Sequence, residues 1–168
     1  KNYIKVTSLE EAYELNQKKS NAIIGGMLWL KMSNRNMQTA IDLSGLGLDK
    51  IEEQEDAFSI GCMCTLRQLE IHEALNRYFG GAMKACTRHI VGTQFRNGAT
   101  VGGSIFGRFG FSDVLTCFLA MDCYVELYKG GIVPLREFVC QKRDRDILVN
   151  VIIRKDVRKI RYVSSRRT

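Results

Sequence analysis

Five glycines fall within the segment 98–113, among hydroxyl side chains and one carboxylate. Because glycine lacks a Cβ atom, such a segment can adopt positive φ angles and lets another molecule approach the main chain closely. Successive backbone N–H groups can then point toward an anion. The hydroxyls of Thr100, Ser104 and Ser112 suit phosphate oxygens, and the carboxylate of Asp113 suits a sugar hydroxyl. The segment therefore predicts a nucleotide-binding loop, although a glycine cluster alone more often marks an ordinary loop.

Two further features of the sequence favour the nucleotide-binding interpretation. A second glycine pair, Gly25-Gly26, directly follows an apolar run that is typical of a strand. The segment 114–121 is apolar, and Ser112 or Asp113 precedes it where a helix cap is expected. Neither glycine segment matches the GxGxxG or Walker pattern, so neither indicates a Rossmann or P-loop site.

The composition indicates an ordinary soluble protein. The chain has 168 residues, of which 45% are hydrophobic and 26% charged, which fits one domain or two small lobes sharing a core. No apolar run approaches the length of a membrane span, so no membrane partner is expected. Six cysteines lie scattered, mostly within apolar runs, which predicts reduced, buried thiols and a cytoplasmic protein.

The formal net charge of +7 is concentrated at one end of the sequence. The segment 154–168 holds seven Lys or Arg and one Asp, whereas the remainder is close to neutral. A nucleic-acid-binding domain usually spreads its basic residues over a face, so no nucleic-acid partner is expected. A contact with a subunit or another domain explains the basic segment equally well.

The pattern of apolar residues predicts a mixed α+β fold. Thr7 or Ser8 begins the first helix, and Thr65 with Gln68 forms the capping-box pattern of another. Strands are expected at 2–6, 21–24, 39–43, 57–64, 123–128, 132–135, 147–153 and 158–164, with 51–56 either a connection or an outer strand. Helices are expected at 8–18, 65–75, 82–89 and 114–121, with a short helical turn at 136–139.

Other residues that could do chemistry lack the partners that such chemistry needs. Cys62 and Cys64 lie on one face of a predicted strand, but no second cysteine pair completes a zinc or iron–sulfur pattern. His72 and His89 have no evident Ser, Cys or carboxylate set for a hydrolytic triad. We therefore expect no metal site and name no catalytic residue.

Two motifs resemble the FAD-binding domain of the molybdenum hydroxylases, the xanthine dehydrogenase and carbon monoxide dehydrogenase flavoprotein group. The first is a Ser-Leu-Glu-Glu-Ala helix start at 8–12, followed by Ile23-Ile24-Gly25-Gly26. The second is an Arg-Asn-x-Ala-Thr-Val-Gly-Gly-Ser sequence at 96–104, followed by Ser112-Asp113 and continued by Ala120-Met121-Asp122. The resemblance covers essentially the whole chain.

The resemblance implies a two-lobed α+β fold of the p-cresol methylhydroxylase (PCMH) type. A small N-terminal α/β lobe (1–52) would precede a larger lobe (53–168) with a mixed or antiparallel sheet and flanking helices. The first loop would wrap the FAD pyrophosphate through its backbone, and Thr100, Gly103 and Ser104 would hold phosphates and nearby hydroxyls. Asp113 would bind a cofactor hydroxyl, and Leu148 would line the isoalloxazine, with Ile90 a further candidate. The residues implied to bind FAD are Ile23, Ile24, Gly25, Gly26, Met27, Leu28, Ile90, Thr100, Val101, Gly102, Gly103, Ser104, Asp113 and Leu148.

The implied role is electron transfer in a xanthine-dehydrogenase-like FAD-dependent oxidoreductase. Molybdopterin and 2Fe-2S clusters on partner subunits would supply electrons, and NAD⁺ or another acceptor would receive them, so the chain alone would not hydroxylate a substrate. Met27-Leu28 stands where relatives often carry Thr and Asp. The sequence also stops roughly where relatives begin a further C-terminal domain. The alternative is a degenerate or truncated flavin domain that acts as a subunit contact without FAD.

Overall fold

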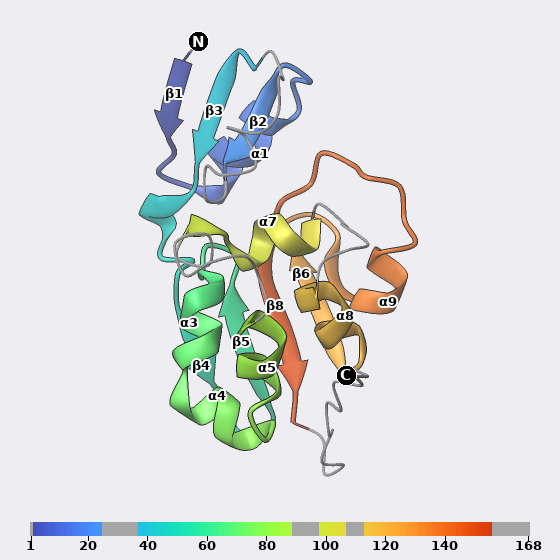
Figure 1. Ribbon diagram of the computed structural model, residues 1–168. Coiled ribbons are helices and arrows are strands. Elements are labelled where there is room, and N and C mark those ends of the chain that lie inside the picture. The colour runs from blue at the N-terminus through green and yellow to red at the C-terminus, as the bar shows by residue number, and fades with distance from the viewer. Residues whose placement is uncertain (1, 25–36, 89–97, 107–112, 156–168) are drawn as a thin grey trace, which may run out of the picture.

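The computed structural model describes residues 2–24, 37–88, 98–106 and 113–155 (Figure 1). The glycine pair of the predicted first loop, the part of the second glycine segment at 107–112 and the predicted strand 158–164 lie outside these ranges. Within the described part of the chain, no helix has the length and apolar character that crossing a membrane requires.

The N-terminal part forms a three-stranded parallel sheet in the order β1-β3-β2. Its strands are β1 (Asn2–Lys5), β2 (Asn21–Ile24) and β3 (Thr39–Asp42), and helix α1 (Leu9–Asn16) connects the first two. The side chain of Ser8 accepts a hydrogen bond from the Glu11 amide, as expected for a helix cap. A short 3-10 turn at Ser44–Leu46 leads out of β3.

The larger sheet is antiparallel throughout, in the order β4-β5-β8-β6-β7. Its strands are β4 (Ile51–Glu53), β5 (Ala57–Gly61), β6 (Cys123–Leu127), β7 (Gly131–Pro134) and β8 (Leu148–Arg154). The most strand-like stretch of the sequence, β8, takes the central position and is largely buried. The division proposed at residue 52 falls within β4, which pairs with β5 in this sheet.

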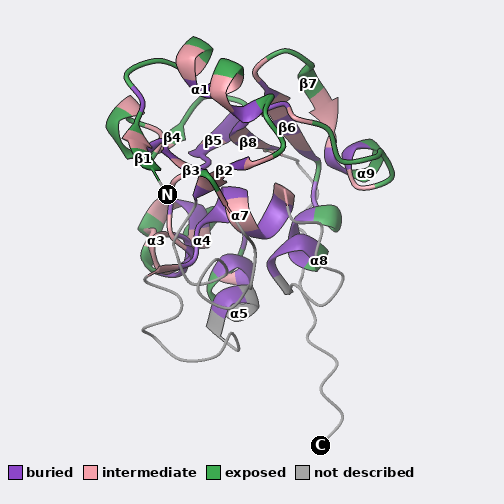
Figure 2. Ribbon diagram, turned by 90° about the horizontal axis from the view of Figure 1, so that it is seen from above, coloured by how far each residue is buried: buried purple, intermediate pink, exposed green. Residues whose placement is uncertain are grey.

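In the part of the chain that the structure describes, helices between Leu66 and Leu119 cover one face of the larger sheet (Figure 2). They are α3 (Leu66–Ile71), α4 (Glu73–Tyr78), α5 (Ala82–Arg88), α7 (Val101–Phe106) and α8 (Asp113–Leu119). Their apolar side chains and those of the sheet form one core, which includes Phe58, Leu69, Val101, Phe118 and Val151. A further short helix, α9 (Leu135–Phe138), follows β7.

Two helix predictions need correction. The single helix expected at 65–75 is two helices, because His72 adopts an extended conformation between them and its ring accepts a hydrogen bond from the Leu75 amide. The capping box at Thr65 is present as predicted. The segment 101–106, expected as part of a glycine loop, is the helix α7, because its apolar side chains are buried in the core.

Candidate functional site

The start of α7 is fixed against the end of β5. The Val101 amide donates to the Cys64 carbonyl at 2.8 Å, and the Gly102 amide donates to the Cys62 carbonyl at 2.9 Å. The Gly103 amide donates to the hydroxyl of Thr100 at 3.2 Å. At these three residues each amide thus has a hydrogen-bond partner inside the protein, and the binding of a phosphate by the main chain of this segment stays a prediction.

Gly102 is required by this close packing. A Cβ atom at position 102 would lie 2.8 Å from the carbonyl oxygen of Cys62 and 2.9 Å from its Cβ. The glycine thus lets the helix backbone approach the strand end, rather than a ligand.

Two hydroxyls remain as candidate donors at this helix. Thr100 Oγ1 accepts from the Gly103 amide and keeps its own proton to donate elsewhere. Among the described residues, no hydrogen bond engages the hydroxyl of Ser104. Thr100 directly precedes α7, and its carbonyl accepts a hydrogen bond from the Ser104 amide at 3.1 Å. Neutral hydroxyl donors of this kind suit phosphate or sugar oxygens, which fits a dinucleotide.

The end of β2 lies against the larger lobe. We name the buried residues Val6, Ala12, Ile41, Leu43, Cys62, Ile147 and Val149 the interlobe cluster, because both sheets contribute to it. Ile23 is partly buried and packs against this cluster, and Ile24 is buried at the end of the strand. Cys62 belongs to the same cluster, and its carbonyl holds the Gly102 amide. The structure thus brings the described parts of both predicted loops to one junction between the lobes.

Of the other predicted site residues, the structure describes the side chain of Leu148 alone. Leu148 begins β8, is 5% exposed and belongs to the core of the larger lobe. The side chain of Asp113, the first residue of α8, lies outside the description. The remaining predicted residues, Gly25, Gly26, Met27, Leu28 and Ile90, also lie outside the described residues.

The structure adds residues at the lobe junction that the sequence did not indicate. Arg145 forms hydrogen bonds with the C-terminal end of α1 and with the segment leading into β2. Its neighbour Asp146 is buried and accepts hydrogen bonds from the turn between β6 and β7. The partners of Arg145 lie more than 120 residues away in sequence, and the turn that Asp146 binds lies 16 and 17 residues before it, so no local pattern could have identified these contacts.

The buried cysteines are poor candidates for nucleophiles or metal ligands. Burial raises the pKa of the Cys62 thiol to about 12 and that of Cys64 to about 11. Burial also raises the pKa of Cys123. These thiols are therefore protonated at neutral pH, whereas metal binding and nucleophilic attack need the thiolate. Cys117 is disulfide-bonded, so the expectation that all six cysteines are reduced is wrong at this position.

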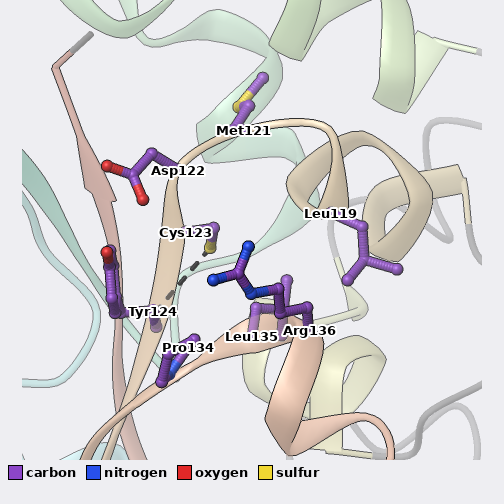
Figure 3. Close-up of a pocket in the computed structure, with 8 residues that line it drawn as sticks. All are labelled: Leu119, Met121, Asp122, Cys123, Tyr124, Pro134, Leu135 and Arg136. Atoms are coloured by element: carbon purple, nitrogen blue, oxygen red, sulfur yellow. Dashed lines mark hydrogen bonds between the residues drawn. The ribbon is translucent and has the colours of Figure 1, made fainter.

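A small pocket lies apart from the lobe junction, between the start of β6 and α9. Its volume is about 100 Å³, and its lining includes Asp122, Tyr124 and Arg136. Figure 3 shows the Arg136 guanidinium extending toward Cys123, whereas the Asp122 carboxylate points away from it. None of the predicted FAD residues lines this pocket, so it is not part of the predicted site.

The comparison with known protein families identifies the family to which the chain belongs. The family described as the FAD binding domain in molybdopterin dehydrogenase matches residues 1–155. The chain belongs to this family, whose members are FAD-containing components of oxidoreductases. The fold predicted from the resemblance is thereby confirmed as the PCMH-type FAD domain.

Individual proteins are similar to the chain in sequence or in fold. "Uncharacterized protein YgfM" of Escherichia coli strain K12 is 26% identical over 160 residues, which are 93% of this chain and 60% of that protein. The reconstituted CO dehydrogenase from Oligotropha carboxidovorans has the same fold, with a TM-score of 0.80 and 20% identity over 92% of this chain and 59% of that one. Quinoline 2-oxidoreductase from Pseudomonas putida 86 gives a TM-score of 0.78 and 17% identity over 93% and 59%. The chain thus spans about three fifths of the length of these relatives.

Proposed function

We propose that this chain binds FAD at the junction of its lobes and passes electrons within a molybdenum hydroxylase. The single observation that carries the proposal is the match of residues 1–155 to the FAD-binding family. The convergence of β2 and α7 on the interlobe cluster supports the placement of the site. The lobes would divide near residue 52, between an N-terminal part (1–52) and a second part (53–168).

Residues of both lobes would contact FAD. The hydroxyls of Thr100 and Ser104 would donate hydrogen bonds to phosphate or ribityl oxygens, with Gly103 allowing close approach between them. Ile23 and Ile24 would place the first glycine loop opposite, and Leu148 would close the apolar side. Bound FAD supplies the redox chemistry, because its ring accepts one or two electrons. The protein orients the cofactor and excludes water from it.

The proposed partners are a molybdopterin-binding subunit and an iron–sulfur subunit of the same complex, with NAD⁺ or another acceptor, as in a xanthine-dehydrogenase-like enzyme. A cytoplasmic location is part of the proposal. The buried free thiols of Cys62, Cys64 and Cys123 support that location, whereas the disulfide of Cys117 argues against it.

Identification of the bound nucleotide tests the proposal. Protein purified without added flavin is denatured, and the released nucleotide is identified by chromatography and mass spectrometry. We expect FAD, together with the absorption bands of oxidised flavin in the native protein. A folded protein that holds no FAD and binds none when FAD is added would support the alternative, an interaction module without cofactor.

Three variants test the placement of the site. Gly103→Ala improves helix propensity by about 1 kcal/mol, so it should keep the fold while the added methyl group weakens FAD binding. Ser104→Ala should weaken binding by removing a hydroxyl donor. The control is Ser59→Ala on β5, where the hydroxyl belongs to a residue paired with Ile152 and outside the site. Unchanged FAD affinity in both α7 variants would contradict the placement.

A further inference from the structure

The connection between α9 and β8 reaches from the larger sheet toward the small N-terminal lobe (Figure 1). Near its end, the Ile147 carbonyl accepts a hydrogen bond from the Tyr128 amide at 2.9 Å, which fixes the connection to the end of β6. Ile147 is also part of the interlobe cluster. The connection is therefore anchored to the larger lobe at the position where it meets the smaller one.

Arg145 uses both its backbone and its side chain to hold the smaller lobe. Its carbonyl accepts from Asn16 Nδ2 and from Gln17 Nε2, each at 2.9 Å. Its guanidinium donates from Nη1 to the Asn21 carbonyl and from Nη2 to the Lys19 carbonyl, each at 3.4 Å. One residue of the larger lobe thus makes four hydrogen bonds to the end of α1 and the start of β2.

Asp146 fixes the backbone next to Arg145. Its carboxylate accepts from the Lys129 amide at 3.0 Å and from the Gly130 amide at 2.8 Å. It also accepts from the Ile147 amide at 2.8 Å. Asp146 is buried, and its hydrogen bonds fix the neighbouring backbone of Arg145 to the larger lobe. The hydrogen bonds of Arg145 to the smaller lobe therefore start from a fixed position.

Arg145 connects the start of β2 with the segment that leads into β8, and both strands carry residues of the proposed FAD site. Asn21 is the first residue of β2, and Ile23 and Ile24 are its last two. Leu148, the first residue of β8, lies three residues after Arg145. The position of β2 relative to β8 therefore depends on Arg145 and on the packing of the interlobe cluster.

We propose that Arg145 is a positioning residue for FAD, which holds the two halves of the site at the separation that one dinucleotide spans. The inference rests on the proposed function. A ligand that contacts both lobes gains affinity when the lobes are already placed correctly, because binding then costs less ordering of the protein. A ligand that contacts one lobe gains nothing from this placement. Arg145 thus acts on FAD through β2 and without touching it.

The test measures the affinity of the apoprotein for FAD and for riboflavin by titration, at a temperature well below the melting point of every variant. The variants are Arg145→Ala, Arg145→Lys and the control Lys142→Ala, which removes an exposed cation from the same connection. We expect Arg145→Ala to weaken FAD binding about tenfold, which is typical of coupling between sites. Riboflavin lacks the phosphates that the two lobes share, so it should bind as it does to the unchanged protein.

Lysine at position 145 can donate to one of the two carbonyls, so Arg145→Lys should recover part of the FAD affinity. Lys142→Ala should leave it unchanged. An Arg145→Ala protein that binds FAD as tightly as the unchanged protein would overturn the inference, and so would an equal loss for riboflavin. If the unchanged protein binds no FAD, the proposed function itself fails, and the two failures are thereby distinguished.

Discussion

A methyl group at position 102 would lie 2.8 Å from the Cys62 carbonyl oxygen, a distance that real Cβ contacts essentially never show. The obstructing atom belongs to the backbone, so relief requires the helix α7 to move away from the strand end. The same carbonyl accepts the Gly102 amide, and this movement would weaken that hydrogen bond as well.

We expect Gly102→Ala to lower the free energy of unfolding by about 1–3 kcal/mol, the usual cost of overpacking a well-filled site. The gain in helix propensity, about 1 kcal/mol, offsets only part of this cost. Urea unfolding of both proteins measures the difference. Lys84→Ala, at an exposed position of α5, is the control and should change little. Unchanged stability of Gly102→Ala would show that α7 adapts without cost.

Asp146 supplies the second prediction at the scale of a residue. Replacement by Ala leaves the amides of Lys129, Gly130 and Ile147 without their acceptor, and bonds to charged groups are worth about 1.5–3 kcal/mol each. Asn retains one acceptor oxygen, so Asp146→Asn should lose less stability than Asp146→Ala. Thermal unfolding of the two variants measures this order, and equal losses would contradict the role given to the carboxylate oxygens.

At the scale of elements, the pairing of β1 with β3 includes a pair of side chains that depends on pH. The hydroxyl of Tyr3 donates to the carboxylate of Asp42, which also accepts from the Ser44 amide at 2.9 Å. Burial tends to raise the pKa of Asp42, but the hydrogen bonds from Tyr3 and Ser44 outweigh it and lower that pKa below its ordinary value. The same hydrogen bond to Asp42 raises the pKa of Tyr3.

The two shifts define a pH window for this contribution. A lowered carboxyl pKa gives stability that is present above the ordinary value, about 3.9, and is lost as the pH falls through the folded-state value. A raised tyrosine pKa gives stability that is present below about 10 and is lost as the pH rises through the folded-state value. We expect the stability difference between the unchanged protein and Tyr3→Phe to be largest between these limits. Urea unfolding at acidic, neutral and alkaline pH measures it, and in an Asp42→Asn background the pH dependence should disappear.

Most elements could be predicted from sequence, because their signals are local. Alternating or continuous apolar residues indicated β1, β2, β6 and β8, and side-chain caps indicated the starts of α1 and α3. The break at His72 and the helix α7 were not predicted. In α7 the burial of Val101 and Ile105 overrides the low helix propensity of two adjacent glycines.

The site was predicted less completely than the fold. Thr100 and Ser104 were identified by residue type and motif, and the structure describes them at one helix. The use of the Val101 and Gly102 amides inside the protein depends on where β5 ends, which lies about forty residues earlier in the sequence. Arg145 was missed for the same reason, since its partners are separated from it by more than 120 residues.

At the scale of the whole molecule, two sheets meet at one apolar cluster and at the hydrogen bonds of Arg145. A ligand that contacts both lobes would add to this connection, because binding to the folded state alone stabilises that state by mass action. FAD at one hundred times its dissociation constant should raise the free energy of unfolding by about 2.7 kcal/mol. Thermal unfolding at increasing FAD concentration measures this as a rising melting temperature, with riboflavin as the control. A melting temperature independent of FAD would contradict binding to the folded protein.

The central position of β8 also has a consequence for how the protein forms in the cell. Both of its neighbours, β5 and β6, are complete in the nascent polypeptide before Leu148 has been synthesised. Until then each of them presents an unpaired edge, which is an opening for association with other polypeptides. A polypeptide that ends within the connection after α9 would therefore keep both edges exposed and be prone to aggregation, whereas the addition of the single strand Leu148–Arg154 covers both.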